Sequence, residues 1–244
     1  MPRGDAASRL ELARGLLRGM EDRAAGVRPQ DAVAASDDQV LPVAAPLAAL
    51  LPSGGLRRGS TVALPDAVGA TSLMFALLAE ASTGGAWAGV VGRPALGLLA
   101  AVEAGVRLER LALVPEPGRD LLAVLVALLD GMDVVVVADA VRAGVRAADR
   151  QRLAARARQR GAVLVSLGPW PGADTELSCT DARWGGLGAG VGRLRARRAR
   201  VLVRGRGGIA RARSAGMLLP ASGGRVAPVA EPWEIRPVPI RAAG

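Results

Sequence analysis

The sequence predicts an α/β protein in which helices cover both faces of a mostly parallel sheet. Short apolar runs alternate with helical segments, and these runs are apolar at every position. Strands of that kind are typical of parallel sheets, whose two faces are both buried. The 244 residues are enough for a full core. An amphipathic helix precedes the alternating region, and two antiparallel strands follow it.

The predicted elements follow a regular order along the chain. Residues 41–60 alternate short apolar runs with Pro and Gly, which indicates a loop-rich approach to the first core strand. Core strands are expected at 60–64, 87–91, 111–114, 134–138 and 163–167, and helices at 70–80, 96–105, 120–129 and 149–160. Residues 175–184 and 195–205 are predicted to pair as antiparallel strands across the glycine-rich stretch 185–192.

The chain divides into three predicted parts. Residues 1–40 hold an N-terminal helix at 5–24 and a linker, and residues 41–213 form the core. The rest, 214–244, is rich in Pro and Gly without periodicity and is expected to be a loosely ordered tail. Its Trp233 is a candidate anchor for a partner.

The first core strand, the turn after it and the next helix have the layout of a phosphate-binding loop. Against the pattern GxxxxGK[ST], Gly69 and Thr71 match, whereas Leu64 replaces the first glycine and Ala70 replaces the lysine. No other lysine can substitute, because all 32 basic residues are arginine. The candidate residues of this degenerate nucleotide site are Gly69, Thr71, Ser72 and Asp139. An ordinary strand–turn–helix is the alternative interpretation.

Composition excludes several kinds of chemistry. The sequence has no histidine or tyrosine and one cysteine, Cys179, so we expect no zinc site, no disulfide framework, no metal and no cofactor. No apolar run approaches the roughly 20 residues of a membrane span. The charged N-terminus does not resemble a signal peptide, and we expect a cytoplasmic protein.

Positive charge is concentrated in the second part of the chain. Residues 1–139 carry 12 arginines against 16 acidic residues, whereas residues 140–244 carry 20 against 6. Such asymmetry suggests a nucleic acid or an acidic protein as partner. The densest cluster comprises Arg193, Arg195, Arg197, Arg198, Arg200, Arg204, Arg206, Arg211 and Arg213. DNA phosphate contact, protein docking and a charged edge strand that prevents aggregation remain open for it.

Residues 105–141, with a short strand, a helix and a buried strand ending in aspartate, resemble the RecA core. The resemblance extends from about residue 5 to 213. Strings such as LPSGGLRRGSTVA, GATSL and RWGGLGAGVGRLRARRARV are similar to the actinobacterial RecA-like accessory protein of the inducible mutasome, the ImuA type.

The resemblance implies roles that this chain keeps only in part. Asp139 matches the carboxylate that orients the water shell of magnesium, but we expect it to be a strand-end residue satisfied by backbone N–H groups. The catalytic glutamate of RecA follows the second core strand, where residues 90–94 carry no carboxylate. The DNA-binding loops of RecA correspond to the short intervals 141–148 and 168–174, which argues against filament-style wrapping of DNA.

The N-terminal helix has two interpretations. Its apolar face includes Leu10, Leu16, Leu17 and Met20. In RecA such a helix packs on the neighbouring subunit, so self-association or a RecA-like partner is one reading, and packing on its own core is the other.

Together these observations predict a noncatalytic pseudo-ATPase adaptor in the SOS response to DNA damage, acting in translesion synthesis and mutagenesis. The resemblance implies an inactive Y-family polymerase homologue of the ImuB type and a C-family polymerase as partners, with DNA contact left open and nucleoid association during damage. The alternatives are a weak nucleotide-binding switch and a regulator of cell division or recombination that acts on a filament.

Overall fold

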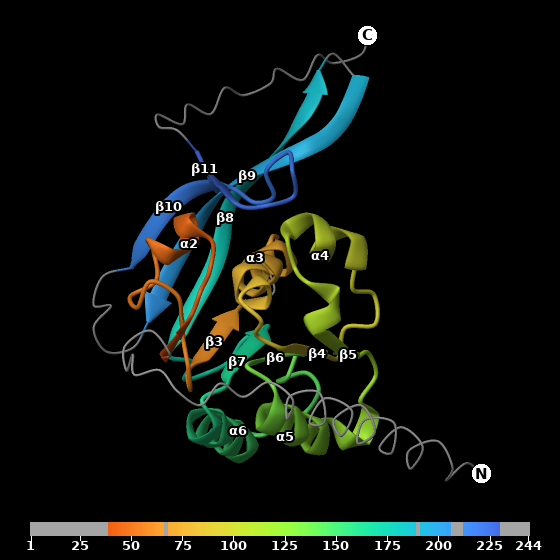
Figure 1. Cartoon of the computed structure of the whole chain (residues 1–244), viewed down its shortest axis with the longest axis vertical. Helices are drawn as coiled ribbons and strands as arrows, with labels where there is room; N and C mark the ends of the chain where they lie inside the picture. Colours follow the sequence, from red (N-terminus) through yellow and green to blue (C-terminus); the bar gives the residue numbers. More distant parts are fainter. Residues whose placement is uncertain (1–38, 66–67, 189–190, 206–211, 230–244) are drawn as a thin grey trace, which may run out of the picture.

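The computed structural model describes residues 39–65, 68–188, 191–205 and 212–229. One nine-stranded sheet dominates the fold (Figure 1). Its strands are β3 (Thr61–Leu64), β4 (Ala88–Val91), β5 (Leu111–Val114), β6 (Val134–Ala138), β7 (Val163–Leu167), β8 (Thr175–Gly188), β9 (Val191–Gly205), β10 (Arg213–Leu218) and β11 (Ala227–Pro228). The α-helices of the core are α3 (Ala70–Thr83), α4 (Leu98–Ala104), α5 (Leu121–Gly131) and α6 (Ala147–Arg160). Short 3-10 turns, Leu108–Arg110 and Gly118–Asp120, precede β5 and α5.

The sheet has a parallel part and an antiparallel part. Its strand order is β11-β10-β9-β8-β3-β7-β6-β4-β5. The six strands from β8 to β5 run parallel, whereas β9, β10 and β11 each pair antiparallel with their neighbour. The predicted fold class, a mostly parallel sheet flanked by helices with antiparallel strands after it, is therefore confirmed.

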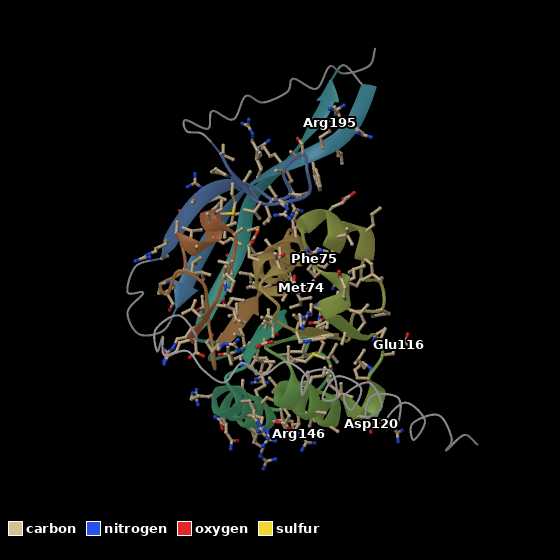
Figure 2. All side chains as sticks on the ribbon, in the orientation of Figure 1. Met74, Phe75, Glu116, Asp120, Arg146 and Arg195 are labelled. Carbon is tan, nitrogen blue, oxygen red and sulfur yellow. The ribbon has the colours of Figure 1, made fainter. Side chains whose placement is uncertain are left out.

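Each face of the sheet has its own core, because side chains alternate along a strand. In β6, Val134 and Val136 pack with α3, whereas Val135 and Val137 pack with α5 and α6. Figure 1 shows α3 and α4 on one side of the sheet and α5 and α6 on the other. Figure 2 shows Met74 and Phe75 of α3 inside the first of these layers. Burial on both faces explains why the sequence of these strands is apolar throughout.

Before β3, the chain forms a small separate sheet. Strands β1 (Val40–Leu41) and β2 (Leu56–Arg57) pair antiparallel around the short helix α2 (Ala45–Ala48). Leu47 and Leu56 are fully buried in the first core. The segment predicted to be a loop-rich approach thus covers one edge of the core.

The C-terminal region differs most from the prediction. The hairpin strands β8 and β9 extend to Gly188 and from Val191, well into the stretch that was predicted to be the connection. Residues 213–218 form β10 instead of starting a loose tail, because Met217 and Leu219 bury their side chains in the first core. Residue 213 is therefore not a boundary between the core and a tail.

Some predictions lie outside the described residues. They include the N-terminal helix with Leu10, Leu16, Leu17 and Met20, the linker, Arg206, Arg211 and Trp233. In the described part of the chain, no helix is long and apolar enough to cross a membrane.

Candidate functional site

The candidate nucleotide site lies between the end of β3 and the start of α3. Gly69 caps the helix with a left-handed backbone, φ 105°, which favours glycine over any residue with a side chain. A methyl group on Gly69 would lie 3.1 Å from the Sγ atom of Cys179 and 3.2 Å from Nη2 of Arg197. The loop therefore packs closely against β8 and β9, and a side chain at residue 69 would have to displace its neighbours as well as adopt a strained backbone.

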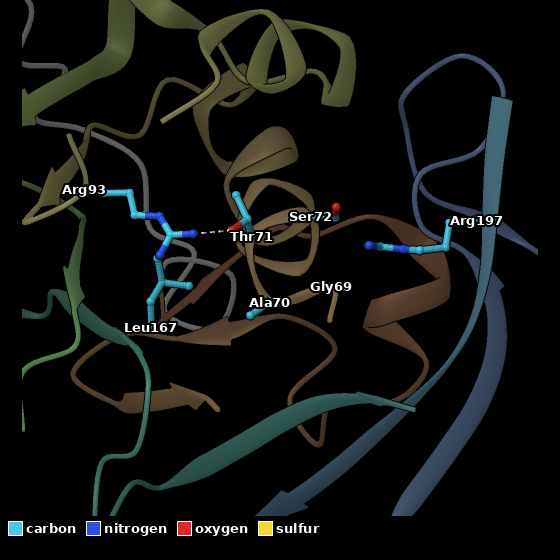
Figure 3. A pocket seen from close by; sticks show the side chains of 7 residues that line it. All are labelled: Gly69, Ala70, Thr71, Ser72, Arg93, Leu167 and Arg197. Atoms are coloured by element: carbon cyan, nitrogen blue, oxygen red, sulfur yellow. Dashed lines mark hydrogen bonds between the residues drawn. The ribbon is translucent and has the colours of Figure 1, made fainter. Parts of the chain in front are cut away.

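A cavity of about 210 Å³ opens against the first turn of α3 (Figure 3). Its lining residues are Gly69, Ala70, Thr71, Ser72, Arg93, Leu167 and Arg197. Three of the four predicted nucleotide-site residues thus lie together, while Asp139 is not part of the lining. No described side chain caps the helix N-terminus, and the first turn of α3 holds no acidic residue.

Arg93 lies just beyond β4, in the stretch where the resemblance to RecA implies a catalytic glutamate. Its Nη2 atom donates a hydrogen bond to Oγ1 of Thr71, 3.2 Å away, drawn as a dashed line in Figure 3. The hydroxyl that would coordinate magnesium in a phosphate-binding loop accepts a hydrogen bond from a cation instead. The sequence showed that a carboxylate was missing here, but it did not show where the arginine points.

Asp139 lies at the end of β6 in a different arrangement from the predicted one. Its backbone is left-handed, φ 51°, and its N–H donates to the carbonyl of Leu167 at 2.6 Å. Its carboxylate accepts a hydrogen bond from Nη1 of Arg142 at 3.3 Å, and not from backbone N–H groups among the described residues. Left-handed backbone at a non-glycine residue costs energy, and Asp tolerates it better than most residues.

Arg197 projects from β9 into the same cavity and is only 6% exposed. Its Nε donates to the carbonyl of Leu219 at 2.7 Å, and its guanidinium carbon lies 5.3 Å from the ring centre of Trp184. Its Nη2 is buried and has no hydrogen-bond partner in the part of the chain that the structure describes. The sequence interpretation placed Arg197 on a surface for DNA or a partner, but its burial excludes an open surface role.

Burial also changes the acidity of two neighbouring groups. It raises the pKa of the Cys179 thiol, although the charge of Arg197 opposes this. It lowers the pKa of the Arg197 guanidinium, with the Cys179 charge acting the other way. Arginine titrates so far above neutrality that the guanidinium keeps its charge, so the site holds a buried cation beside a neutral thiol.

The remaining described members of the arginine cluster are exposed. In β9, alternation turns Arg198, Arg200 and Arg204 to solvent while Ala199, Val201 and Val203 enter the core. The other exposed members are Arg193, Arg195 and Arg213. Their exposure is what a basic surface requires, and the exposed arginines of β9 are called the basic strip below.

Strand β8, which pairs with β9, brings further positive charge to the same region. Arg183 of β8 stands directly opposite Arg198 of β9, and both are exposed. Like charges in opposite positions destabilise a strand pair. Asp181 forms an ion pair with Arg200 over 3.7 Å, so part of the strip is neutralised within the chain.

The outer part of the hairpin, residues 183–188 and 191–196, is called the arm below. Strand β10 last pairs with β9 at Arg198, and β3 pairs with β8 only near its start, so the arm is a two-stranded ribbon. Figures 1 and 2 show it projecting from the body of the protein, with Arg195 near its end. Trp184, Leu187 and Leu194 of the arm are exposed by 47%, 61% and 50%.

The described residues hold no group of three or more His, Cys, Asp or Glu side chains that is suited to a metal ion. Sequence reasoning missed the parts that Arg93 and Arg197 play at α3. The signal for Arg93 was its position after the second core strand. Alternation separates Arg197 from Arg198 and Arg200, because it is in phase with the buried residues of β9, but it does not separate Arg197 from the exposed Arg195.

Known proteins resemble this chain in sequence and in structure. A family model described as the MT3502 N-terminal domain matches residues 49–172. Uncharacterized protein Rv3395c of Mycobacterium tuberculosis (strain ATCC 25618 / H37Rv) is 40% identical over 167 residues, which cover 63% of this chain and 81% of that protein. The crystal structure of the RadB recombinase is similar with a TM-score of 0.54 and 16% identity, over 75% of this chain and 96% of that one. These matches support a RecA-like fold.

Proposed function

The chain belongs to the MT3502 N-terminal domain family, and we propose that it is a RecA-like adaptor that catalyses no reaction itself. We place it in the copying of damaged DNA, because its sequence resembles the ImuA type of mutasome accessory protein. The RecA-like fold is compatible with a role in DNA repair, and the adaptor role is the step that we add.

The Arg93–Thr71 hydrogen bond carries this proposal. Phosphoryl transfer in a phosphate-binding loop needs a lysine on the phosphates and a magnesium ion held by the Ser or Thr of the loop and by an aspartate. Here Ala70 stands in place of lysine, the Thr71 hydroxyl accepts a hydrogen bond at 3.2 Å, and Asp139 pairs with Arg142. Each of these three features departs from one of those requirements.

The arm supports a binding role. It exposes three large apolar side chains on a ribbon that carries several arginines, and exposed apolar side chains rimmed by charge are typical of interaction sites. The like-charge pair Arg183 and Arg198 favours a partner that brings negative charge. DNA phosphates and an acidic protein surface both satisfy this requirement.

The partners that we propose are an inactive Y-family polymerase homologue of the ImuB type and, through it, a C-family polymerase. The adaptor then contacts the polymerase homologue directly and brings its basic strip to DNA. Trp184 and Leu187 fit protein contact, whereas Arg198 and Arg200 fit contact with phosphates.

The test is co-purification of the full chain with the Y-family polymerase homologue from the same organism. We expect a stable complex that the arm variant Trp184→Ala/Leu187→Ala weakens at least 10-fold. The control variant Leu99→Ala/Val102→Ala removes exposed apolar side chains from α4 instead, and it should leave the complex intact. A complex that neither variant weakens would show that the interface lies outside the arm.

ATP hydrolysis by the purified chain would contradict the noncatalytic part of the proposal. If the purified chain hydrolyses Mg-ATP and Thr71→Val abolishes the activity, the noncatalytic assignment is wrong. Failure to bind the polymerase homologue, together with no effect on damage-induced mutagenesis when the gene is deleted, would remove the adaptor role.

A further inference from the structure

Arg197 presents a buried donor that finds no acceptor among the described residues. Its backbone N–H donates to the carbonyl of Pro220 at 2.8 Å, its carbonyl accepts from Leu219 at 2.7 Å, and its Nε donates to Leu219 at 2.7 Å. These bonds and the Trp184 ring fix the side chain, and Nη2 remains without a partner beside the first turn of α3. Buried charged groups are normally paired, so an orphaned guanidinium nitrogen calls for an anion.

The surroundings of Nη2 carry more positive charge. The N-terminus of α3, a helix of 14 residues, has a partial positive charge and N–H groups that no described side chain caps. Arg93 lines the same cavity, and Figure 3 shows its guanidinium and that of Arg197 on opposite sides of this first turn. Two cations and a helix N-terminus thus face one space, and none of the described residues that line it is acidic.

We propose that this cavity binds a phosphate group in its magnesium-free form, either inorganic phosphate or the terminal phosphate of a nucleotide. Helix N-terminal N–H groups and guanidinium forks are the donors that bind phosphate best. A tetrahedral oxyanion accepts from several directions at once, which suits donors on both sides of the turn. This inference does not rest on the adaptor role, because it concerns a ligand and not a partner protein.

Magnesium has no place in this arrangement. The Thr71 hydroxyl already accepts from Arg93, and Asp139 pairs with Arg142 outside the cavity lining. A divalent cation would also be repelled by the two guanidinium groups while it neutralises the phosphate charge that they attract. ATP in EDTA should therefore bind more tightly than Mg-ATP, which is the reverse of the order in a working phosphate-binding loop.

The experiment is calorimetric titration of the full chain with inorganic phosphate, pyrophosphate, and ATP with EDTA or with magnesium, at constant ionic strength set with chloride. Arg197→Gln and Arg93→Gln should each weaken binding at least 10-fold. The matched control Arg119→Gln removes an exposed arginine of the 3-10 turn before α5, outside the cavity lining, and should leave affinity unchanged. Equal affinity for all three probes in EDTA identifies free phosphate as sufficient, and tighter binding of ATP identifies a nucleotide; both support the site.

A second variant keeps the test decisive if Arg197→Gln does not fold. Ala70→Glu places a carboxylate on the cavity lining, where it can take the place of the anion. We expect this variant to melt at a higher temperature and to lose phosphate binding. The proposal is overturned by no saturable binding of any probe at millimolar concentration, by binding that requires magnesium, or by equal binding in wild type, Arg93→Gln and Ala70→Glu.

Discussion

The Nη2 atom of Arg93 donates a hydrogen bond to Oγ1 of Thr71 over 3.2 Å, across the first turn of α3. Arg93 belongs to the stretch beyond β4 where the resemblance to RecA implies a catalytic glutamate, and Thr71 is the hydroxyl that would hold magnesium in a phosphate-binding loop. A site that used ATP in this way would need Thr71 free and a carboxylate in that stretch. The contact instead occupies the Thr71 hydroxyl with a cation from the same stretch.

Replacing Thr71 by valine should affect stability and not catalysis. The substitution removes a hydrogen bond to a charged group at a half-buried position, and we expect a loss of about 1–2 kcal/mol in the free energy of unfolding. Phosphate release from Mg-ATP should be at background in both wild type and variant. Urea denaturation and a phosphate-release assay measure the two effects. An activity in wild type that disappears in the variant would contradict the prediction.

Gly69→Ala should destabilise the protein more than Gly85→Ala. Both residues have positive φ, 105° and 95°, so each substitution forces alanine into a left-handed backbone at a cost of about 1–2 kcal/mol. Only at Gly69 would the new methyl group crowd Cys179 and Arg197, whereas nothing lies within 4 Å at Gly85. Chemical denaturation of the pair separates crowding from backbone strain. Equal losses would show that the loop moves aside easily.

Periodicity predicted the parallel core well, because its strands are short apolar runs, rich in valine, that are separated by turn residues and helical segments. Strands β5, β6 and β7 begin and end at the predicted residues. Helix α3 extends to Thr83, beyond the predicted end at 80, because Ala81 and Ser82 are still buried against the core. Local patterns place an element correctly when one environment applies along its whole length.

The hairpin and β10 were harder to predict for a physical reason. Glycines at 185, 186, 188 and 192 suggested a connection, yet they lie within or beside a long ribbon with irregular register. Residues 213–218 show little alternation, since only Met217 is fully inside the core. The position of Arg93 and Arg197 beside α3 depends on contacts between distant segments, which no local pattern records.

Arg198→Gln should reduce the dependence of DNA binding on salt. If Arg198 neutralises one duplex phosphate, its loss lowers the slope of log K against log salt by about 0.9. Arg119→Gln, at an exposed arginine of the 3-10 turn before α5, is the matched control and should leave the slope unchanged. Fluorescence anisotropy from low to moderate salt measures both slopes. The same reduction in both variants would indicate general attraction by net charge.

Arg198→Glu should also stabilise the hairpin. It turns the like-charge pair with Arg183 into an opposite-charge pair, and such cross-strand changes contribute about 0.2–1 kcal/mol. Thermal unfolding of Arg198→Glu, Arg183→Glu and the double variant forms a cycle. Each single variant should be more stable than wild type, whereas the double variant should return toward it. A stable double variant would show that these two charges do not interact.

Asp130→Asn should make stability less dependent on acid. Asp130 of α5 accepts hydrogen bonds from Arg156 at 2.6 Å and from Arg160 at 3.0 Å, both on α6. The hydrogen bond from Arg156 is the main cause that lowers the pKa of Asp130, while partial burial opposes it and the charges of both arginines add to it. A lowered pKa stabilises the fold above the ordinary value of 3.8, and this contribution is lost as pH falls through the folded value.

Wild type should therefore exceed Asp130→Asn in stability by a constant, modest margin near neutral pH, since the pair is partly exposed to solvent. The margin should shrink below about pH 4, where the carboxylate becomes protonated in the unfolded chain. Urea denaturation at several pH values gives the two curves. A margin that stays constant down to strongly acidic pH would assign the difference to packing and not to charge.

Met217→Ala tests whether β10 is part of the folding unit. Met217 is fully buried against the first core, and truncating a buried methionine to alanine costs about 2–5 kcal/mol. Arg213→Ala, on the same strand but exposed, should change stability by no more than about 0.5 kcal/mol. If residues 213–218 were a loose tail, both variants would unfold at the wild-type denaturant concentration. A large loss for Met217→Ala alone means that the antiparallel strands hold β9, and with it Arg197, against the cavity.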